Sequence, residues 1–182
     1  MAEIETERLT LRPYRSGDAA LIHRLTSDLR VFFWRTEPGT LSEAEDKLAS
    51  ILASFRESGM GWWAVFGKGC KNDQDAFLGQ VGLQPLPDSD FIEIAYHFAP
   101  QEWGNGFATE SARAILDHGF RELHLNQIVA VILPDNKPSL RVIQRLAMPY
   151  IEDRMHANLT HRFFALTREA YISAHGDALE KA

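Results

Sequence analysis

The sequence predicts an α+β fold: a single domain of 182 residues built on one mixed, mostly antiparallel sheet. Two observations carry this prediction. Three strand-like segments follow one another in the middle of the chain, and strand-like and helix-like segments alternate after them. A chain of this length buries roughly 70% of its unfolded surface, so it can form a core without cross-links. We take residues 1–182 as one domain.

Composition narrows the class of protein. Hydrophobic residues make up 45% and charged residues 24%, which argues against disorder, collagen and coiled coil. The 19 basic and 25 acidic residues give a net charge of −6, and no basic run occurs, so we expect no nucleic-acid partner. Cys70 is the single cysteine, which argues against disulfides and thiolate metal clusters.

The location of the protein is predicted from what the sequence lacks. Its first residues are charged and show no apolar signal core, and no apolar run approaches the ~18 residues of a membrane helix. We expect a cytoplasmic protein without membrane contact, whose partner is a small molecule or a protein.

The first third of the chain predicts a strand and a short helix. Residues 7–12 alternate, with Leu9 and Leu11 on one face, and Pro13 ends the strand. Ser16 is a candidate N-cap for the helix. The apolar stripe of that helix is Leu21, Ile22 and Leu25. The aromatic-rich segment 31–39 is expected to form a loop or a short helix.

A longer helix is the clearest element. Thr40 and Glu43 fit a capping box, with Ser42 and Glu45 as a second possibility, and Gly59 supplies the stop. Its apolar positions recur at helical spacing: Ala44, Leu48, Ile51, Leu52 and Phe55.

Three strands are expected next, at 61–67, 76–84 and 91–98. A polar turn over 68–73 joins the first two, and a hairpin loop over 85–90 joins the last two. A glycine turn at 104–106 then precedes a helix. The apolar stripe of this helix is Ala108, Ala112, Ile115, Leu116 and Gly119.

The last third predicts a strand, a helix, a strand and a helix. Residues 127–133 are a continuous apolar run, typical of a buried strand. After a turn at 134–136, residues 137–146 form a helix with Leu140, Ile143 and Ala147 inward. A strand over 161–166 leads to a C-terminal helix capped by Thr167.

The glycine turn is the chemically informative feature. Gly104 and Gly106 let backbone N–H groups approach a ligand, and the helix that follows adds unpaired donors and positive potential. Such a turn suits a pyrophosphate without basic side chains. The same glycines could also make a tight turn and nothing more, and the motif alone leaves both interpretations open.

Two nucleotide-binding alternatives were considered. A Walker loop is excluded because no Gly-Lys-Ser or Gly-Lys-Thr occurs. A dinucleotide fingerprint is weakened because Thr109 stands where a third glycine is needed. Asp135 could still supply the acidic residue that this fingerprint requires, so a dinucleotide-binding protein stays open.

The wider pattern resembles the GNAT acetyltransferase superfamily. Residues 101–106 match Q/R-x-x-G-x-G/A, the acyl-CoA pyrophosphate loop of that superfamily. Residues 103–110 resemble the W-G-x-G-[FY]-A-T-E string of the subfamily that acetylates ribosomal-protein N-termini and related substrates. Four further stretches resemble this subfamily in the right order, over about residues 5–170: 7–13, 77–83, 93–96 and 136–143.

The resemblance implies a GNAT-like fold and a cofactor site. The sheet would be splayed between two central strands, with helices on both faces and acyl-CoA in the gap; acetyl-CoA is the default co-substrate. The backbone of Phe98, Ala99 and Pro100 would bind the pantetheine arm, and Asn136 would reach it. The other cofactor-binding residues implied lie in the pyrophosphate loop and the first helical turn: Gln101, Glu102, Trp103, Gly104, Asn105, Gly106, Phe107, Ala108 and Thr109.

The resemblance also implies an activity. Members pass the acyl group directly from the thioester to an amine, so we expect an acetyl-CoA-dependent N-acetyltransferase. The acceptor would be a primary amine, either a protein N-terminus or a small molecule, with an internal lysine also open. We expect no metal and consider a homodimer. The alternative is a catalytically degenerate module that binds acyl-CoA for regulation.

Candidate catalytic residues follow from the needs of this reaction. Strand alternation places Glu93 and His97 on one face, with Glu93 the first candidate base and His97 the second. A backbone N–H near Phe98 would stabilise the oxyanion. Many family members protonate the leaving thiolate with a tyrosine on the helix after the asparagine. Here Ser139 replaces it, because Tyr150 lies beyond that helix.

The acceptor side is predicted from position in the family pattern. Phe32, Phe33 and Trp34 would wall the acceptor site, and His97 would contact the substrate. A loop over 155–161 would bring His156 and His161 to the acceptor, without metal-ligand spacing. One departure concerns the turn after the asparagine helix, where residues 147–149 replace the usual Gly-Phe pair. We expect Pro149 to force this turn.

Overall fold

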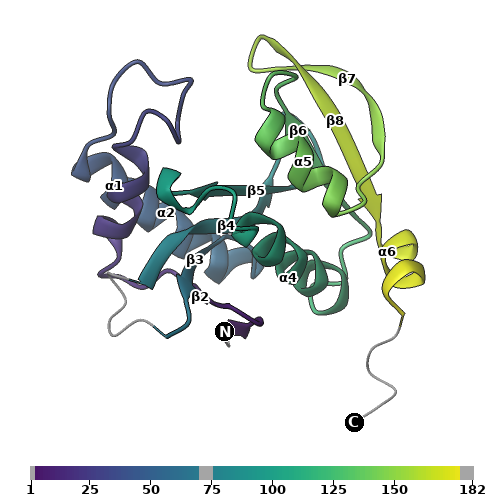
Figure 1. Ribbon diagram of the computed structural model, residues 1–182, viewed down its shortest axis with the longest axis horizontal. Coiled ribbons are helices and arrows are strands. Elements are labelled where there is room, and N and C mark those ends of the chain that lie inside the picture. Colours follow the sequence, from purple (N-terminus) through teal and green to yellow (C-terminus); the bar gives the residue numbers. More distant parts are fainter. Residues whose placement is uncertain (1–2, 70–75, 177–182) are drawn as a thin grey trace.

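The computed structural model describes residues 3–69 and 76–176 and has an eight-stranded sheet with helices on both faces (Figure 1). The strand order is β1-β2-β3-β4-β5-β6-β8-β7. The strands are β1 (Ile4–Glu5), β2 (Leu9–Pro13), β3 (Trp62–Gly67), β4 (Phe77–Pro85), β5 (Ile92–Phe98), β6 (Gln127–Ile132), β7 (Tyr150–His156) and β8 (Leu159–Thr167). The helices are α1 (Ala19–Thr26), α2 (Leu41–Ser58), the 3₁₀ turn η1 (Pro100–Glu102), α4 (Phe107–Arg121), α5 (Lys137–Arg145) and α6 (Arg168–His175). This confirms the predicted α+β class.

The sheet opens between β5 and β6, whereas β5 stays fully paired with β4. β4 and β5 pair antiparallel over their whole length, from Gly79 opposite Phe98 to Pro85 opposite Ile92. β5 and β6 run parallel, and their register has a single pair, Glu93 opposite Val129. Beyond that pair β5 has lost its neighbour on one side. The backbone groups there that point away from β4 are therefore left for a ligand.

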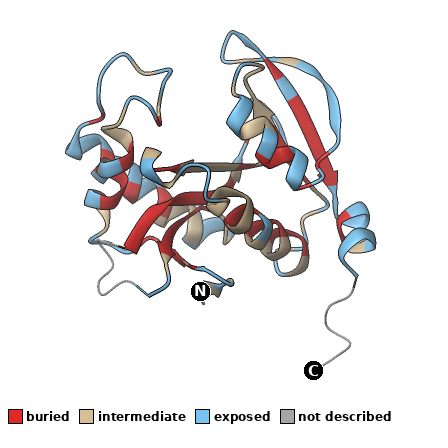
Figure 2. Ribbon diagram, viewed as in Figure 1, coloured by how far each residue is buried: buried red, intermediate tan, exposed pale blue. Residues whose placement is uncertain are grey.

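Two hydrophobic cores lie on opposite faces of the sheet. One packs α4 and α5 against it and includes Leu116, Phe120 and Ile143. The other packs α1 and α2 against it and includes Leu25 and Leu48. Figure 2 shows the buried residues along the strands and the inward helix faces. The two cores fix the helices that flank the opening.

Capping sets the ends of α1 and α2. In α2, Thr40 Oγ1 accepts from Glu43 N–H at 3.2 Å and Glu43 Oε2 accepts from Thr40 N–H at 2.8 Å, which confirms the first capping box. Gly59, at φ 70°, ends this helix as predicted. The prediction for α1 was wrong: its N-cap is Asp18, not Ser16. The Asp18 carboxylate binds Arg12 and the backbone of Arg15, at 2.6 and 2.7 Å.

Two edge strands were not predicted. β1 has only two residues, and β7 is largely exposed, so neither has an alternating apolar pattern. Residues 155–161, expected as a loop, instead form the end of the β7–β8 hairpin. Its turn is made by Ala157 and Asn158, at φ 48° and 62°. The turn predicted over 68–73 lies outside the described residues from Cys70 onward.

The end of α5 differs from expectation in one residue. Ala147 is exposed, not inward, and has φ 54°. Its N–H donates to Gln144 O, and Met148 N–H donates to Ile143 O, which is a Schellman motif. Ala147 therefore occupies the left-handed position that favours glycine, and it turns the chain in place of Pro149. The next strand is consequently reached by an ordinary helix stop.

Candidate acyl-CoA and acceptor site

The glycine turn forms an open helix start after the end of β5 that is not paired with β6. Gly104 and Gly106 have φ 82° and 84°, and Gly106 is the N-cap of α4. A Cβ built on Gly104 would meet no heavy atom within 4 Å, so this face of the turn is open. The first N–H groups of α4 have no acceptor within the helix and point at this space. The turn can therefore hold a pyrophosphate.

The segment before β2 braces this turn, a contact that sequence reasoning missed. Thr6 Oγ1 donates to Glu110 Oε1 at 2.6 Å, and Arg8 Nε donates to Glu110 Oε2 at 2.7 Å. Arg8 Nη1 also donates to Asn105 O at 2.9 Å, and its guanidinium lies 4.8 Å from the centre of the Phe107 ring. One arginine thus joins the turn, the first helical turn and the N-terminal segment.

Some backbone groups at the end of β5 already form hydrogen bonds within the protein. Trp103 Nε1 donates to Phe98 O at 2.8 Å, and Ala99 N–H donates to Leu78 O at 3.0 Å. By the alternation of the β4–β5 ladder, Phe98 N–H points away from β4 toward the opening. Of the predicted pantetheine contacts, Phe98 N–H is the donor that faces the opening, whereas Ala99 N–H is already paired.

The start of α5 lies on the other side of the opening. Asn136 Oδ1 accepts from Ser139 N–H at 3.2 Å, so Asn136 caps the helix. Tyr96 O–H donates to Ser139 O at 3.2 Å and thereby connects β5 to α5 across the gap. Burial raises the pKa of Tyr96, and the hydrogen bond to Ser139 opposes this shift only in part, so the hydroxyl stays protonated.

Glu93 is held by a short chain of polar side chains on the α1–α2 face of the sheet. Gln84 Nε2 donates to Glu93 Oε1 at 2.6 Å, and Trp62 Nε1 donates to Gln84 Oε1 at 3.0 Å. Burial raises the pKa of the Glu93 carboxyl, while the Gln84 hydrogen bond and the charge of His156 lower it less. The carboxyl is therefore a stronger base than an exposed glutamate.

His97 belongs to a second chain of this kind on the same face. Tyr14 O–H donates to Gln80 Oε1 at 2.8 Å, and Gln80 Nε2 lies 3.2 Å from His97 Nδ1. Burial, and to a lesser extent the charge of nearby Lys47, lower the pKa of His97 to about 4. The ring is therefore neutral near pH 7.

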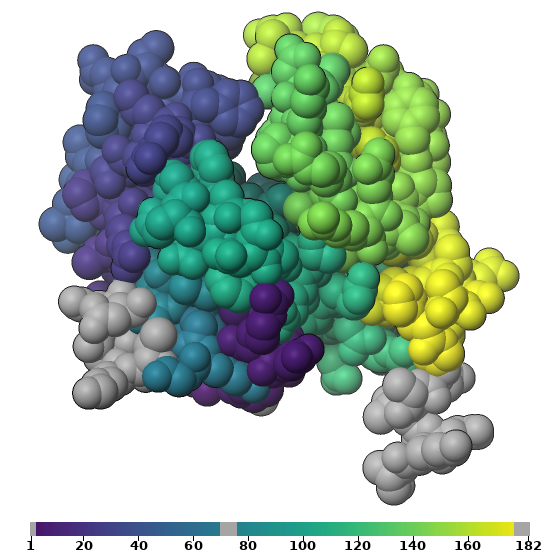
Figure 3. Space-filling model, in the orientation of Figure 1, coloured from purple at the N-terminus to yellow at the C-terminus, as the bar shows by residue number. Residues whose placement is uncertain are grey.

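Aromatic side chains of the segment before α2 form one wall of the site. Phe32 stacks on His97 with ring centroids 4.5 Å apart, and the Trp34 ring lies 6.1 Å from His97. Phe33 and Trp34 remain 51% and 56% exposed. In the space-filling view, a hollow separates this segment (blue-purple) from α5 (green), above the loop that follows β5 (teal) (Figure 3).

The two hairpin histidines lie in strands, His156 in β7 and His161 in β8, and the charge of His156 lowers the pKa of Glu93. The rings of His156 and His161 are 5.5 Å apart, and His161 is buried. Within the described ranges, no group of three or more His, Cys, Asp or Glu side chains could hold a metal ion.

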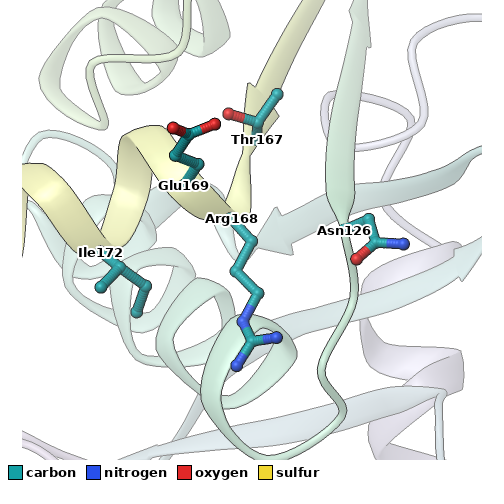
Figure 4. Close-up of a pocket in the computed structure, with 5 residues that line it drawn as sticks. All are labelled: Asn126, Thr167, Arg168, Glu169 and Ile172. Carbon is teal, nitrogen blue, oxygen red and sulfur yellow. The ribbon is translucent and has the colours of Figure 1, made fainter.

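A separate pocket lies where β8 meets α6 (Figure 4). It is lined by Asn126, Thr167, Arg168, Glu169 and Ile172. It contains none of the predicted site residues, and the Arg168 N–H closes its floor by donating to Asn126 O.

Comparison with known proteins identifies the family. The model of the acetyltransferase (GNAT) domain matches residues 8–149. The chain belongs to the GNAT acetyltransferase family. It is 30% identical to the uncharacterized N-acetyltransferase YnaD of Bacillus subtilis over 80% of this chain and 81% of that protein. The uncharacterized protein YkkB of B. subtilis is 46% identical, but the match spans 41% of this chain and 44% of YkkB.

Solved structures confirm the GNAT fold. Mycobacterium smegmatis RimJ in complex with CoA-disulfide superposes with a TM-score of 0.70 at 22% identity, covering 92% of this chain and 89% of that chain. In the described part of this GNAT protein, no helix is long and apolar enough to span a membrane.

Proposed function

We propose that this GNAT protein is an acetyl-CoA-dependent N-acetyltransferase that transfers an acetyl group directly to a primary amine of a protein N-terminus or a small molecule. One observation carries the proposal. The open helix start at Gly104 and Gly106 and the buried carboxyl of Glu93 belong to the same strand-and-turn segment, beside the opening between β5 and β6. An anion site and a base next to one gap suit acyl transfer from a long anionic thioester.

Cofactor binding is assigned to backbone groups. Of the expected pyrophosphate-binding stretch, residues about 102 to 107, the N–H groups from Gly104 to Phe107 would hold the pyrophosphate, because those of Glu102 and Trp103 already donate to Ala99 O and Pro100 O. Phe98 N–H would bind the pantetheine arm. Asn136 would contact that arm from the start of α5. The CoA complex of M. smegmatis RimJ supports a CoA ligand for this fold.

Transfer is assigned to two side chains. Glu93 takes a proton from the ammonium of the acceptor, and the amine then attacks the thioester carbon. The C–S bond breaks as the carbonyl re-forms, the attacking nitrogen passes its surplus proton to the departing thiolate, and Ser139 donates a hydrogen bond to that thiolate. No step requires a covalent enzyme intermediate or a metal.

A thiol-release assay tests the proposal. Acetyl-CoA is offered with a panel of small amines and peptides, and CoA binding is measured in parallel. We expect thiol release with at least one amine, matched by acetylated product. Binding of CoA without transfer to any amine would favour the regulatory-module alternative.

A matched pair of glycine substitutions tests the cofactor loop. Gly104→Val points a side chain into the open face of the turn, whereas Gly69→Val introduces the same strain at φ 87° in an equally open place. We expect a large rise in KM for acetyl-CoA with Gly104→Val alone. Wild-type kinetics in a folded Gly104→Val protein would refute this assignment.

A further inference from the structure

His97 is not used in the proposed transfer, although it lies on the same face of β5 as Glu93. Its ring is held between Phe32, 4.5 Å away and inclined by 24°, and Trp62, 5.2 Å away and inclined by 26°. Stacking on both faces leaves only the edge of the imidazole, with its two nitrogens, for hydrogen bonding.

The tautomer of His97 follows from its neighbours. Tyr14 and Gln80 are 3% and 4% exposed, and Tyr14 O–H donates to Gln80 Oε1. Reversing the Gln80 amide would leave the Tyr14 hydroxyl hydrogen without an acceptor in the core, which is unfavourable for a buried polar group. Gln80 therefore presents its N–H to His97 Nδ1. A neutral imidazole that accepts at Nδ1 carries its proton on Nε2.

The charged and titratable groups around the ring keep it neutral. Lys47 of α2 faces it with a positive charge, and Tyr14, behind Gln80, has a pKa raised by burial. The aromatic segment before α2 contributes only rings at this point. In this state Nε2 is a hydrogen-bond donor and cannot take a proton from an amine.

The Nε2 atom is open to the site. In the described part of the chain no protein group accepts from it. Buried side-chain atoms without a partner in that part are Thr109 Oγ1 and His118 Nε2, so His97 Nε2 is not sealed in the core. The Nε2–H group of His97 is thus a fixed donor that faces solvent or substrate, on the same face of β5 as Glu93.

We propose that His97 is a further catalytic residue, whose Nε2–H donates a hydrogen bond to the carbonyl oxygen of the acyl thioester. This inference rests on the proposed function. The amine needs a proton acceptor, Ser139 of α5 donates to the thiolate, and Phe98 N–H is assigned to the pantetheine arm. The carbonyl oxygen, for which the sequence predicted a donor near Phe98, is therefore the reacting atom that His97 of β5 can serve. As the N–C bond forms, the carbonyl electron pair moves to oxygen, and it returns as the C–S bond breaks. His97 keeps its proton throughout, and its held ring needs little reorganisation.

Substitution separates a hydrogen bond from packing. His97→Phe keeps a ring between Phe32 and Trp62 but removes the donor. Loss of one oxyanion donor typically costs about 10²–10³-fold in kcat. We expect such a fall with KM for acetyl-CoA unchanged, and partial rescue by His97→Gln, whose amide restores an N–H. His175→Phe is the control, because His175 stacks on Tyr171 in α6 at 4.4 Å, and its kinetics should not change.

Two results would overturn the proposal. A folded His97→Phe protein with kcat within about threefold of wild type would show that His97 only packs. Independently of any variant, ¹⁵N-histidine spectra of the full chain between pH 5.5 and 8 should show a neutral Nε2–H ring. An Nδ1–H or titrating ring would contradict the inference. The proposed function has a separate test, because it fails if the wild-type protein transfers acetyl to no amine. The spectra report only the tautomer of His97 and do not depend on that result.

A variant can also invert the tautomer without removing the ring. Gln80→Glu places a carboxylate against Nδ1, which attracts a proton to that atom. We expect the spectrum to change and kcat to fall although shape is kept. An unchanged kcat with a changed spectrum would separate the tautomer from catalysis and overturn the proposal.

Discussion

Glu93 and Ser139, the two side chains assigned to the acetyl transfer, lie in different local environments. Glu93 is half-buried and accepts one hydrogen bond from Gln84, which leaves its second carboxylate oxygen for a substrate. The backbone N–H and C=O of Ser139 are both bonded, to Asn136 and Tyr96, so the residue is fixed while its hydroxyl can turn. At this scale, hydrogen-bond partners decide which atom is available for chemistry.

Glu93→Gln should abolish general-base catalysis while keeping shape, because Gln84 can still donate to the new amide oxygen. Loss of a general base costs about 10²–10⁴-fold in rate. The base works deprotonated, so the wild-type rate should fall as pH drops through the raised pKa of Glu93. Steady-state pH profiles should show that this acidic limb is lost in the variant. Glu152→Gln, on the exposed edge strand β7, is the control and should keep it. A loss below about threefold would assign the base elsewhere.

Ser139→Ala should slow departure of the thiolate. A hydrogen bond to a charged group contributes about 1.5 kcal/mol, which corresponds to roughly a tenfold fall in kcat. An acetyl donor with a more acidic thiol should shrink this deficit, since its thiolate needs less help. The ratio of kcat values for the two donors measures it. An equal deficit with both donors would mean that Ser139 positions the cofactor only.

At the scale of elements, turns and braces position the site. The glycine turn is tied to the N-terminal segment through Arg8 and Glu110, and the start of α5 is tied to β5 through Tyr96. Neither contact is local in sequence: Arg8 and Glu110 are 102 residues apart. The two sides of the opening are therefore held by different parts of the chain.

Arg8→Ala should loosen the pyrophosphate turn with little effect on stability. Arg8 is 46% exposed, so the ion pair itself contributes at most about 1 kcal/mol to unfolding free energy. We expect KM for acetyl-CoA to rise roughly fivefold, the equivalent of about 1 kcal/mol, with kcat unchanged. Arg15→Ala, which removes the exposed pair with Glu3, is the matched control. Equal KM values for both variants would show that the brace does not order the turn.

Ala147→Gly should stabilise the protein. The left-handed conformation costs a residue with a Cβ about 1 kcal/mol, and glycine avoids this cost. For a chain of this size we expect Tm to rise by about 2–4 °C. Ala49→Gly, in the exposed middle of α2, should lower Tm, because there glycine only adds unfolded-state freedom. Calorimetry of both variants measures whether Tm rises or falls in each. A fall in Tm with Ala147→Gly would refute the strain assigned to this helix end.

At the scale of the molecule, a ligand in the opening between β5 and β6 would contact both halves of the sheet and so stabilise the whole fold. The opening is flanked by both cores, and a ligand in it would add a link between β5 and β6, whose register has the single pair Glu93–Val129. A net charge of −6 does not prevent an anionic ligand, since backbone N–H groups supply the local positive potential.

CoA should therefore raise the melting temperature of the whole chain. Ligand at 100 times its Kd stabilises by about 2.7 kcal/mol, which corresponds to roughly 5–10 °C here. NAD at equal concentration should give no comparable shift, because the turn lacks the third glycine of a dinucleotide site. Differential scanning calorimetry with each ligand decides between them. A larger shift with NAD would revive the dinucleotide interpretation.

The expectation of a homodimer and of a cytoplasmic location stays a prediction. So do the boundaries 1–182 of the domain and the identity of the acceptor amine.

Local signals made much of this protein predictable from sequence. The capping box at Thr40 and the stop at Gly59 act within one helix, and the apolar run of β6 reports its own burial. The Gly104–Gly106 turn and its family pattern predict an acyl-CoA loop, because positive φ and open backbone donors are requirements on single residues. These features depend on neighbours only a few positions away, and they can therefore be predicted from the sequence without the tertiary structure.

The tertiary structure alone decided the rest. The pairing of Arg8 with Glu110, the chain Tyr14–Gln80–His97 and the edge strand β7 all join residues far apart in sequence, through contacts that no local pattern encodes. Sequence alternation could place Glu93 and His97 on one face of β5. Only packing shows that burial and the Gln84 hydrogen bond shift the pKa of the first in opposite directions, and that Gln80 faces Nδ1 of the second. Desolvation and hydrogen-bond partners exist only once the elements have come together.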